Sequence, residues 1–478
     1  MFMLPLPKQY VRNSGDFVFS KKLVITLPEG ICDSRFLPHL CGLVSGYTAG
    51  RVSAEFVTSK KLSNAAVIAD AAFDGEICGK TENDYELCCT GENIKFYFSD
   101  RLGFVHAFTS FLQLIRIEGT PDELFFRVPC YEIKDKPDLS FRAVHLCVFV
   151  QTSLDFLKKA ISLCGIMKCS HVVLEFWGTY RYECCPSLAW KEAYTKEQIR
   201  PIIEFANALG LEVIPMLNHL GHASQARICS GKHSALDNDL ALAPLFEEDG
   251  WSWCTSNPET KKLLALCRKE LIELCGEGKY FHIGCDEAYT FGSCDKCSKK
   301  SRNELMKEHL VNITEDLKKY GRRPIMWSDM LLNRADFDEK YEIYGKEEYK
   351  IRPELPRDII MADWQYSITE EFETSKVFSN DGFDVVTCPW RTRNNVSAAV
   401  DTAKNNGLFG VLGTTWHTLA EMQWLIPYIS DGMWGNTELL TDQEYTLYFS
   451  YNVRRCVPSG GEYKKAGFLE KELAGRTL

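Results

Sequence analysis

The sequence lacks the features that would place the protein at a membrane or on a nucleic acid. No stretch reaches the roughly 18 consecutive apolar residues of a membrane span. The opening segment, MFMLPLPKQYVRNSGDF, contains two prolines and no apolar run of the roughly 7–15 residues found in secretory signals. There is no run of lysine and arginine, and the formal net charge of -10 would repel phosphate backbones and anionic lipid. We therefore expect a cytoplasmic protein with a neutral or small polar ligand, and neither nucleic acid nor membrane as partner.

Low-complexity sequence is also missing. The chain has 478 residues, of which 45% are hydrophobic and 25% charged. This is enough apolar material for one large domain of about 250–300 residues and a smaller one. The 20 cysteines lie in a long chain without a recognisable secretory signal. We therefore predict reduced thiols that pack as small hydrophobic side chains.

The order of strand-like and helix-like segments predicts two domains and a C-terminal extension. Residues 1–137 are assigned to a small α+β domain, because β-rich runs alternate with turn residues around one amphipathic stretch, 105–115. The charged segment 132–141 contains a proline and marks the boundary. Short apolar runs alternate with helical patterns over 138–435. Residues 436–478 are assigned to an extension that packs on this second domain.

Eight candidate strands in the second domain predict an α/β fold, the (β/α)8 or TIM barrel. Thr195 with Gln198 has the pattern of a capping box, and Asn257 before Pro258 is an N-cap followed by a proline at the first helical position. Parallel strands buried on both faces account for the nearly continuous apolar runs. The candidate strands are 142–149, 171–176, 212–217, 279–285, 324–329, 359–364, 384–390 and 409–416.

In such a barrel the catalytic groups come from the carboxyl ends of the strands. Several predicted strands end at or beside a tryptophan, and a set of tryptophans on one rim suits stacking on sugar rings. The polar and aromatic residues at these ends are Glu175, Trp177, Asn218, His219, His222, Asp286, Glu287, Trp327, Asp329, Trp364, Tyr366, Trp390, Arg391, Trp416 and His417.

The strongest chemical signal is the pair Asp286 and Glu287. An acidic pair is usually solvated surface, but this one follows the apolar strand 279–285, where burial can raise a carboxyl pKa toward the working range of a general acid. Successive strand side chains point to opposite faces. The two acids can therefore serve one substrate only if the backbone leaves regular strand geometry there.

The segment HIGCDE, residues 282–287, resembles the H-x-G-G-D-E signature of glycoside hydrolase family 20, the β-N-acetylhexosaminidases, with Cys285 in place of the second glycine. The strings VIPMLNHLGHA, IMWSDML, MADWQY and LGTTWHTLAE extend the resemblance. It is closest to the branch that contains cytosolic hexosaminidase D and bacterial exo-β-N-acetylglucosaminidases. Two further regions depart from the family. In the first strand, Ala143 and Cys147 stand where the family usually carries a glycine and an aspartate. Thr418 stands where secreted members carry a hydroxyl-binding glutamate, which leaves Glu421 as a candidate for that role.

The resemblance implies an exo-acting, retaining hydrolase of terminal β-linked GlcNAc or GalNAc that needs no cofactor. Its partner is a small amino-sugar glycoside whose own acetamide attacks the anomeric carbon. Glu287 is implied as the general acid and base, and Asp286 as the group that holds the acetamide and stabilises an oxazolinium-like charge. The implied substrate-binding residues are Arg142, His222, Trp327, Asp329, Trp364, Tyr366, Trp416 and Glu421. The choice of sugar and the oligomeric state, a homodimer included, stay open.

Two other functions stay open beside this one. A metal-dependent barrel hydrolase is considered because His219 and His222 lie three residues apart. Cys294 and Cys297 have the spacing of half a structural zinc site, although its other two ligands are not evident and ordinary loop thiols are the alternative. A carbohydrate-binding barrel without turnover would keep the pocket despite Cys285 and the altered first strand. Metal analysis and hydrolysis of a chromogenic β-N-acetylhexosaminide separate these possibilities.

Overall fold

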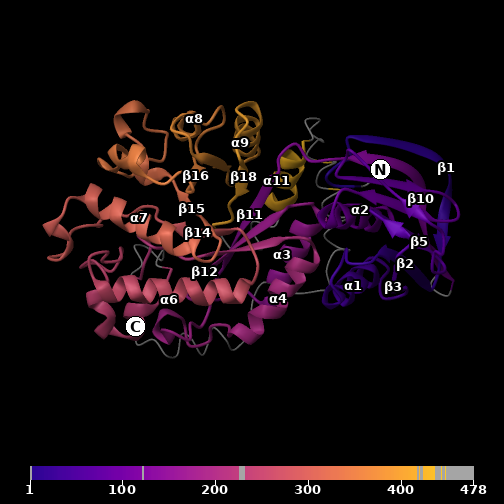
Figure 1. The fold of residues 1–478 in the computed structure, drawn as a ribbon, viewed down its shortest axis with the longest axis horizontal. Coiled ribbons are helices and arrows are strands. Elements are labelled where there is room, and N and C mark those ends of the chain that lie inside the picture. The colour runs from indigo at the N-terminus through magenta and orange to yellow at the C-terminus, as the bar shows by residue number, and fades with distance from the viewer. Residues whose placement is uncertain are drawn as a thin grey trace.

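A computed structural model describes residues 3–120, 123–224, 232–416, 419, 424–435, 443 and 447. It contains an N-terminal sheet with two helices and a closed barrel surrounded by helices, and the two lie side by side along the long axis of the molecule (Figure 1). The C-terminal extension predicted at 436–478 lies almost entirely outside the described residues.

The N-terminal sheet has the strand order β1-β10-β7-β8-β5-β2-β3, with β9 paired to β10. Its elements are β1 (Gln9–Phe19), β2 (Lys22–Pro28), α1 (Leu37–Tyr47), β3 (Ser53–Ser59), β5 (Ala65–Ala69), β7 (Tyr85–Cys89), β8 (Ile94–Phe98), α2 (Arg101–Leu114), β9 (Arg116–Gly119) and β10 (Leu124–Asp135). A short pair, β4 (Leu62–Ser63) and β6 (Ile77–Cys78), lies outside this sheet. The predicted amphipathic stretch is α2, which begins where Asp100 accepts a hydrogen bond from the Gly103 amide. Nearly all of α2 is buried because it packs on both the sheet and the barrel helix α3 (Leu154–Ile166).

The eight barrel strands are parallel and closed, as the sequence predicts. Each begins within one residue of its predicted start. The strands are β11 (Phe141–Val148), β12 (His171–Phe176), β13 (Glu212–Met216), β14 (Tyr280–Gly284), β15 (Arg323–Trp327), β16 (Ile360–Trp364), β17 (Asp384–Cys388) and β18 (Gly410–Gly413). The fold is therefore a (β/α)8 barrel preceded by a separate sheet.

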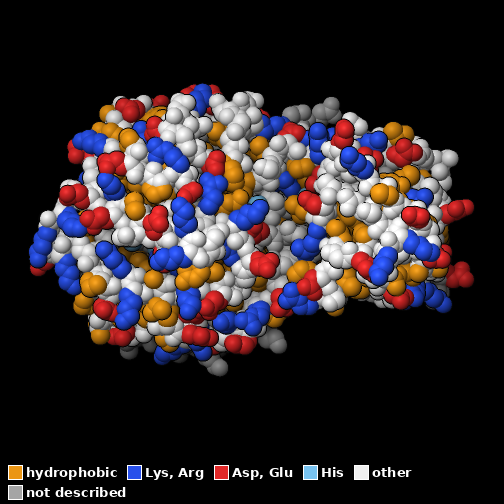
Figure 2. Space-filling view, in the orientation of Figure 1, with side chains coloured by type: hydrophobic (Ala, Val, Ile, Leu, Met, Phe, Trp, Pro, Cys, Tyr) orange, Lys and Arg blue, Asp and Glu red, His pale blue; other side chains and the backbone are white. Residues whose placement is uncertain are grey.

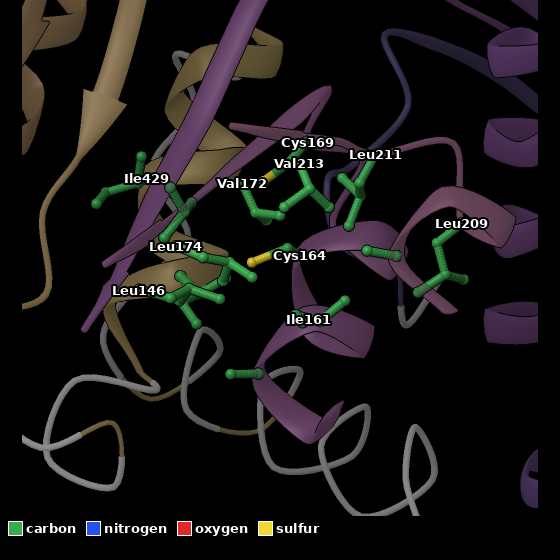
Figure 3. Close-up of a cluster of buried hydrophobic side chains, with 14 of the residues drawn as sticks. Leu146, Ile161, Cys164, Cys169, Val172, Leu174, Leu209, Leu211, Val213 and Ile429 are labelled. Carbon is green, nitrogen blue, oxygen red and sulfur yellow. The ribbon is translucent and has the colours of Figure 1, made fainter. Parts of the chain in front are cut away.

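The barrel strands bury both faces in two separate cores. Outside the strands, Ile161 and Cys164 of α3 pack among side chains that include Leu146 and Leu174 of the neighbouring strands (Figure 3). Inside the barrel, the side chains of a second cluster fill the lumen, so the barrel is a packed core. This inner cluster comprises Phe141, Ala143, Val173, Ile214, Met216, Ile325, Trp327, Ile360, Ala362, Trp364, Val386, Cys388 and Leu412.

The helix signals read from the sequence mark real helix ends. The Thr195 amide donates to Gln198 Oε1 at 2.9 Å at the start of α4 (Lys196–Ala208). Asn257 accepts from the Glu259 amide at the start of α6 (Pro258–Cys275). The other helices around the barrel include α7 (Arg302–Lys318), α8 (Glu373–Asn380), α9 (Arg393–Asn405) and α11 (Leu425–Trp434).

One connection differs from the predicted alternation of strands and helices. Residues 328–358, between β15 and β16, contain 3-10 turns where an α-helix is expected, among them η5 (Asp329–Leu331) and η7 (Glu348–Glu354). Gly345 lies so close to this loop's own backbone that a Cβ there would be 2.1 Å from the Met330 carbonyl oxygen. Pro353 lies inside η7, where it removes a backbone donor. The loop therefore folds back on itself instead of forming a helix.

The helices of the described residues include none that is long and apolar enough to cross a bilayer. On the face shown in Figure 2, lysine and arginine side chains are interspersed with aspartate and glutamate over the barrel and the N-terminal sheet. This face therefore has no broad region of a single sign that would steer a polyanion.

Candidate active site

The backbone leaves strand geometry at the predicted acids, as their use on one substrate requires. β14 ends at Gly284, and Gly284, Cys285 and Glu287 have φ of +65°, +76° and +46°. Gly284 cannot carry a side chain, because a Cβ would lie 2.1 Å from Asn218 Oδ1. Cys285 occupies a left-handed conformation that glycine adopts at little cost, which explains physically why a glycine would suit this position.

One histidine brings the two carboxylates to the same side. His222 Nε2 lies 3.2 Å from Asp286 Oδ2 and 2.9 Å from Glu287 Oε2. His222 follows Gly221, whose absent Cβ would lie 2.0 Å from the Asp286 carbonyl oxygen, so the loop after β13 rests directly on the loop after β14. The Asp286 side chain is 7% exposed and that of Glu287 is 23% exposed. Glu287 is thus the acid better placed to exchange protons with solvent.

His222 and Asp286 stabilise each other's charged forms. Burial lowers the pKa of His222, but Asp286 and Glu287 outweigh it and raise that pKa to about 9. Burial raises the pKa of Asp286, but Lys232 and His222 outweigh it and leave the pKa below its ordinary value. At neutral pH the site therefore holds a protonated His222 beside an ionised Asp286.

Asp286 also has unused capacity to accept a hydrogen bond. Its Oδ1 atom is buried and accepts no hydrogen bond from any residue that the structure describes. A buried, ionised oxygen without a donor is unfavourable by roughly 1–3 kcal/mol or more. A ligand N–H or O–H group would satisfy it.

Glu287 is held from several directions. The Tyr289 hydroxyl donates to Glu287 Oε1 at 2.6 Å, and Trp251 Nε1 donates to the Glu287 carbonyl oxygen at 2.7 Å. Asp329 Oδ2 accepts from the Glu287 amide at 2.9 Å, and Asp329 Oδ1 accepts from Trp364 Nε1 at 3.2 Å. Asp329 is fully buried, with both oxygens engaged by the protein. It is therefore placed to position Glu287 rather than to contact a substrate.

Several predicted aromatic residues pack against one another, and Trp364 is linked to Glu287 through Asp329. Trp327 is fully buried and its ring lies 5.4 Å from that of Trp416. Trp416 Nε1 donates to the Tyr366 hydroxyl, and the Tyr366 ring lies 5.1 Å from that of Trp364. Tyr344, which the sequence did not single out, stacks on Trp364 at 5.8 Å. The predicted residues Trp327, Trp364, Tyr366 and Trp416 thus form one continuous wall.

The structure adds a buried ion pair, of which the sequence analysis had identified only the glutamate. Lys232 Nζ lies 2.8 Å from Glu175 Oε1 and 4.8 Å from the centre of the Trp416 ring. His145 Nε2 lies 3.0 Å from Glu175 Oε2. Glu175 is at a predicted strand end, whereas Lys232 comes from a long loop in which no sequence pattern distinguishes it. Tyr289, which bonds to Glu287, was not predicted either. Its only signal in the sequence is its position two residues after Glu287.

This group also bears on the metal-dependent alternative. His145, Cys147 and Glu175 lie close enough to share an ion. However, the ammonium of Lys232 already neutralises Glu175, which fits a buried ion pair better than a cation site. His219 does not join His222, because its Nδ1 is 2.6 Å from the Leu217 carbonyl oxygen.

One predicted substrate-binding residue, Arg142, is not brought to the carboxylates. Arg142 is the second residue of β11 and lies at the amino end of the barrel. Its guanidinium donates to the carbonyl oxygens of Lys168, Leu139 and Ser140. Glu421 lies outside the described residues.

Comparison with known proteins gives one family. The model of "Glycosyl hydrolase family 20, catalytic domain" matches residues 167–405. A β-hexosaminidase of Porphyromonas gingivalis is 25% identical over 280 residues, which are 52% of this chain and 36% of that protein. Hexosaminidase D of Bos taurus is 27% identical over 188 residues, 37% of this chain and 51% of that protein. The matches thus span about a third to a half of these relatives.

A solved structure extends the similarity to nearly the whole fold. The exo-β-N-acetylglucosaminidase of Vibrio harveyi, solved in complex with N-acetylglucosamine, aligns with a TM-score of 0.70 over 95% of this chain and 76% of that one. The sequence identity is 17%, so this likeness shows the architecture alone.

Proposed function

This chain belongs to glycosyl hydrolase family 20, and from that premise we propose that it is an exo-acting, retaining β-N-acetylhexosaminidase that removes terminal β-linked GlcNAc or GalNAc. The observation that carries the proposal is the pair of carboxylates that share His222 Nε2, at 3.2 Å for Asp286 and 2.9 Å for Glu287. Two acids that meet at one histidine, each in a different environment, suit glycosidic bond cleavage.

Glu287 is proposed as the general acid and base. It is the more exposed of the two acids, and its carboxylate is oriented by Tyr289 and His222. In the first step its proton passes to the leaving oxygen of the glycosidic bond. In the second step it takes a proton from the water that attacks the anomeric carbon.

Asp286 is proposed to serve the acetamide of the substrate, which acts as the nucleophile. Its buried Oδ1 would accept the acetamide N–H, and its negative charge would stabilise the positive charge that develops as the acetamide oxygen attacks the anomeric carbon. The ring closes as an oxazolinium ion and the glycosidic bond breaks, so β configuration is retained after water opens the ring. No bond forms between the protein and the sugar.

The aromatic wall gives the pocket its shape. Trp327, Trp364 and Trp416 are proposed to enclose the acetyl group and the sugar ring. The Tyr366 hydroxyl accepts from Trp416 Nε1, so its own O–H proton is available to the acetamide oxygen. Arg142 is left out of this proposal because its side chain lies at the opposite end of the barrel. The roles of His222 and Asp329 are to hold the two acids.

The test is hydrolysis of chromogenic β-N-acetylhexosaminides together with inhibition by a thiazoline analogue of N-acetylglucosamine. The analogue imitates the cyclised intermediate, so we expect it to bind more tightly than the substrate by at least about a hundredfold. Glycosides without the 2-acetamido group are expected to be cleaved very poorly, because they lack the nucleophile.

Two further experiments distinguish the acetamide mechanism from a direct attack by Asp286. We expect Asp286→Asn to slow cleavage of acetamido substrates by on the order of 10²–10³, the effect of losing one preorganised charge stabiliser. Mass spectrometry of protein quenched during turnover of a 2-fluoro glycoside is expected to show no sugar adduct. A stable adduct on Asp286 would contradict the mechanism, and a folded protein that binds N-acetylglucosamine without hydrolysis would favour a binding barrel. The cytoplasmic location stays a prediction from the sequence.

A further inference from the structure

A second cluster of chemically reactive side chains lies beside the candidate active site and is not used by the proposed reaction. It consists of Glu247, Cys254, Cys294 and Cys297, each of which offers one ligand atom within 4.8 Å of the others. Three of the four are buried, and Cys294 is half-buried. The cysteines that the structure describes are all free thiols, these three included.

The three sulfur atoms are arranged around a common point. Cys254 Sγ lies 3.4 Å from Cys294 Sγ and 3.6 Å from Cys297 Sγ. In a tetrahedral zinc site with Zn–S bonds of about 2.3 Å, neighbouring sulfurs are about 3.8 Å apart. The observed separations are within a few tenths of an ångström of this value. Because both separations are slightly shorter than this value, a small outward shift of the same three side chains would make room for an ion between them.

Two rigid turns deliver these ligands. Phe246 and Trp253 form an antiparallel bridge, and the Glu247 amide donates to the Ser252 carbonyl oxygen at 2.8 Å, so Glu247 and Cys254 stand at the two ends of one tight hairpin. The Ser298 amide donates to the Cys294 carbonyl oxygen at 2.9 Å, which closes the turn between Cys294 and Cys297. Two cysteines with two residues between them on a closed turn are the usual first half of a structural zinc site.

Glu247 provides the fourth ligand, a carboxylate oxygen. Its Oε2 accepts from the Cys294 amide at 2.7 Å and from Ser293 Oγ at 3.2 Å, while Oε1 accepts from the Gly292 amide at 3.1 Å. These bonds fix the carboxylate next to the sulfurs, as hydrogen bonds to metal-ligating carboxylates do. Its side chain is almost completely buried, and no lysine or arginine among the described residues forms an ion pair with it.

We propose that Cys254, Cys294, Cys297 and Glu247 bind one Zn²⁺ ion in a closed structural site. Binding would release the protons of the three thiols, and the ion would neutralise half of the combined charge of the three thiolates and the Glu247 carboxylate. A closed set of four protein ligands leaves no position for substrate, so the ion would stabilise structure and take no part in the chemistry.

The position of the site gives it a consequence for the active site. The hairpin carries Trp251, which donates to the Glu287 carbonyl oxygen, and Asp249, which accepts from Thr290 Oγ1 at 3.0 Å. The zinc would therefore connect the loop after β13, which carries His222, to the loop after β14, which carries Glu287. The site itself does not depend on the proposed glycosidase function.

The first test measures zinc in full-length protein purified under reducing conditions without chelator. We expect about one zinc per chain, and less than about 0.2 in Cys254→Ser, Cys294→Ser and Cys297→Ser variants. Cys184→Ser is the matched control, because Cys184 Sγ lies 3.5 Å from Cys267 Sγ and no described residue adds a third ligand atom to that pair. The control is expected to keep its zinc.

The second test uses the unmodified protein and so does not depend on variants that fold poorly. After chelation and reduction, addition of Co²⁺ is expected to produce the thiolate-to-metal absorption and the intense visible bands of a tetrahedral site, and Zn²⁺ should displace it. Glu247→Gln is expected to weaken zinc binding by at least about tenfold. An unchanged affinity in that variant would overturn the assignment of Glu247 as a ligand.

Other results would overturn the site as a whole. They are reduced protein that takes up neither Zn²⁺ nor Co²⁺, equal zinc in the Cys254→Ser and unmodified proteins, or a disulfide between Cys254 and Cys294 in freshly purified protein. Hydrolysis assays are independent of these measurements. Zinc without activity would contradict the proposed function alone, and activity without zinc would contradict the zinc site alone.

Discussion

At the scale of single residues, the two adjacent acids of the candidate site have different surroundings. Asp286 is almost buried and faces Lys232 and His222, which hold its pKa below the ordinary value. Glu287 is more exposed and bonds to Tyr289 and His222. Differences of this kind are how two carboxyl groups in one pocket take different roles.

The first prediction concerns the proton donor. Glu287→Gln is expected to keep the fold and lose at least about a hundredfold in kcat, since general acid catalysis contributes 10²–10⁴. The loss should be smaller for an aryl leaving group, which needs little protonation, than for a sugar. Steady-state kinetics on both substrate types checks this. Equal losses on the two would argue against Glu287 as the acid.

The second prediction concerns the charge on His222. Its pKa is raised to about 9, so the stability it contributes is fully present below the unfolded value near 6.5 and is lost as pH rises through about 9. Between about pH 7.5 and about pH 10 the unmodified protein should therefore lose on the order of 2 kcal/mol of unfolding free energy relative to His222→Gln.

Chemical denaturation of both proteins at the two pH values measures this difference. His309→Gln is the matched control, because burial holds the pKa of His309 at about 4 and the histidine is neutral across that range. The difference between His309→Gln and the unmodified protein should change little with pH. A His222→Gln difference that is the same at both pH values would show that His222 does not carry the charge.

At the scale of secondary structure elements, the function depends on where a strand stops. β14 ends at Gly284, and the positive φ values of the following residues turn both acids toward His222. A regular strand would have placed one of them in the barrel and the other against the surrounding helices. The irregular backbone is therefore part of the site.

The third prediction tests this strand end. Gly284→Ala is expected to destabilise the protein by about 2–5 kcal/mol and to lower activity at least about tenfold, because alanine is strained at φ +65° and its Cβ would meet Asn218 Oδ1. Gly321→Ala is the matched control, since Gly321 has φ +67° and nothing within 4 Å of its Cβ position. The control should cost only about 1–2 kcal/mol and leave kcat unchanged. Similar losses in both variants would show that the contact with Asn218 is unimportant.

At the scale of the whole molecule, a buried polar network joins the N-terminal sheet to the barrel. Lys168, in the loop between α3 and β12, is fully buried, with Nζ 2.7 Å from the Tyr85 hydroxyl and 3.2 Å from Asp135 Oδ2. Tyr85 and Asp135 belong to β7 and β10, and the ammonium also lies over the ring of Trp434 in α11. The Lys168 ammonium thus contacts both the N-terminal sheet and the last described helix of the barrel.

The fourth prediction follows from that network. Lys168→Met is expected to lower the unfolding free energy by about 3–5 kcal/mol, because it leaves the buried Asp135 charge unpaired. The double variant with Asp135→Asn should recover part of the loss. Lys307→Met removes an exposed partner of Glu354 and should cost less than about 1 kcal/mol. Equal losses in the Lys168 and Lys307 variants would contradict a structural role for the network.

Much of the architecture could be predicted from the sequence because it depends on local patterns. Apolar runs bounded by turn residues marked the eight strands to within one residue at their starts. Asn257 before Pro258 marked a helix start, because capping satisfies the first amides of a helix from neighbouring residues. The acidic pair was singled out for the same reason, since charged residues directly after a buried strand are unexpected unless they have a function.

Tertiary structure alone decided which distant residues share the site and which do not. Lys232, Trp251 and Tyr344 come from long loops whose sequences carry no periodic signal, and only the packing of those loops places them beside the acids. Arg142 has the residue type expected for a sugar contact, yet its bonds to carbonyl oxygens hold it at the amino end of the barrel. Likewise, Cys294 and Cys297 have in the sequence only the spacing of half a zinc site, and the hairpin that brings Glu247 and Cys254 next to them could be recognised only in three dimensions. Local patterns depend on near neighbours in the chain, whereas a site is assembled from residues that only the closed barrel brings together.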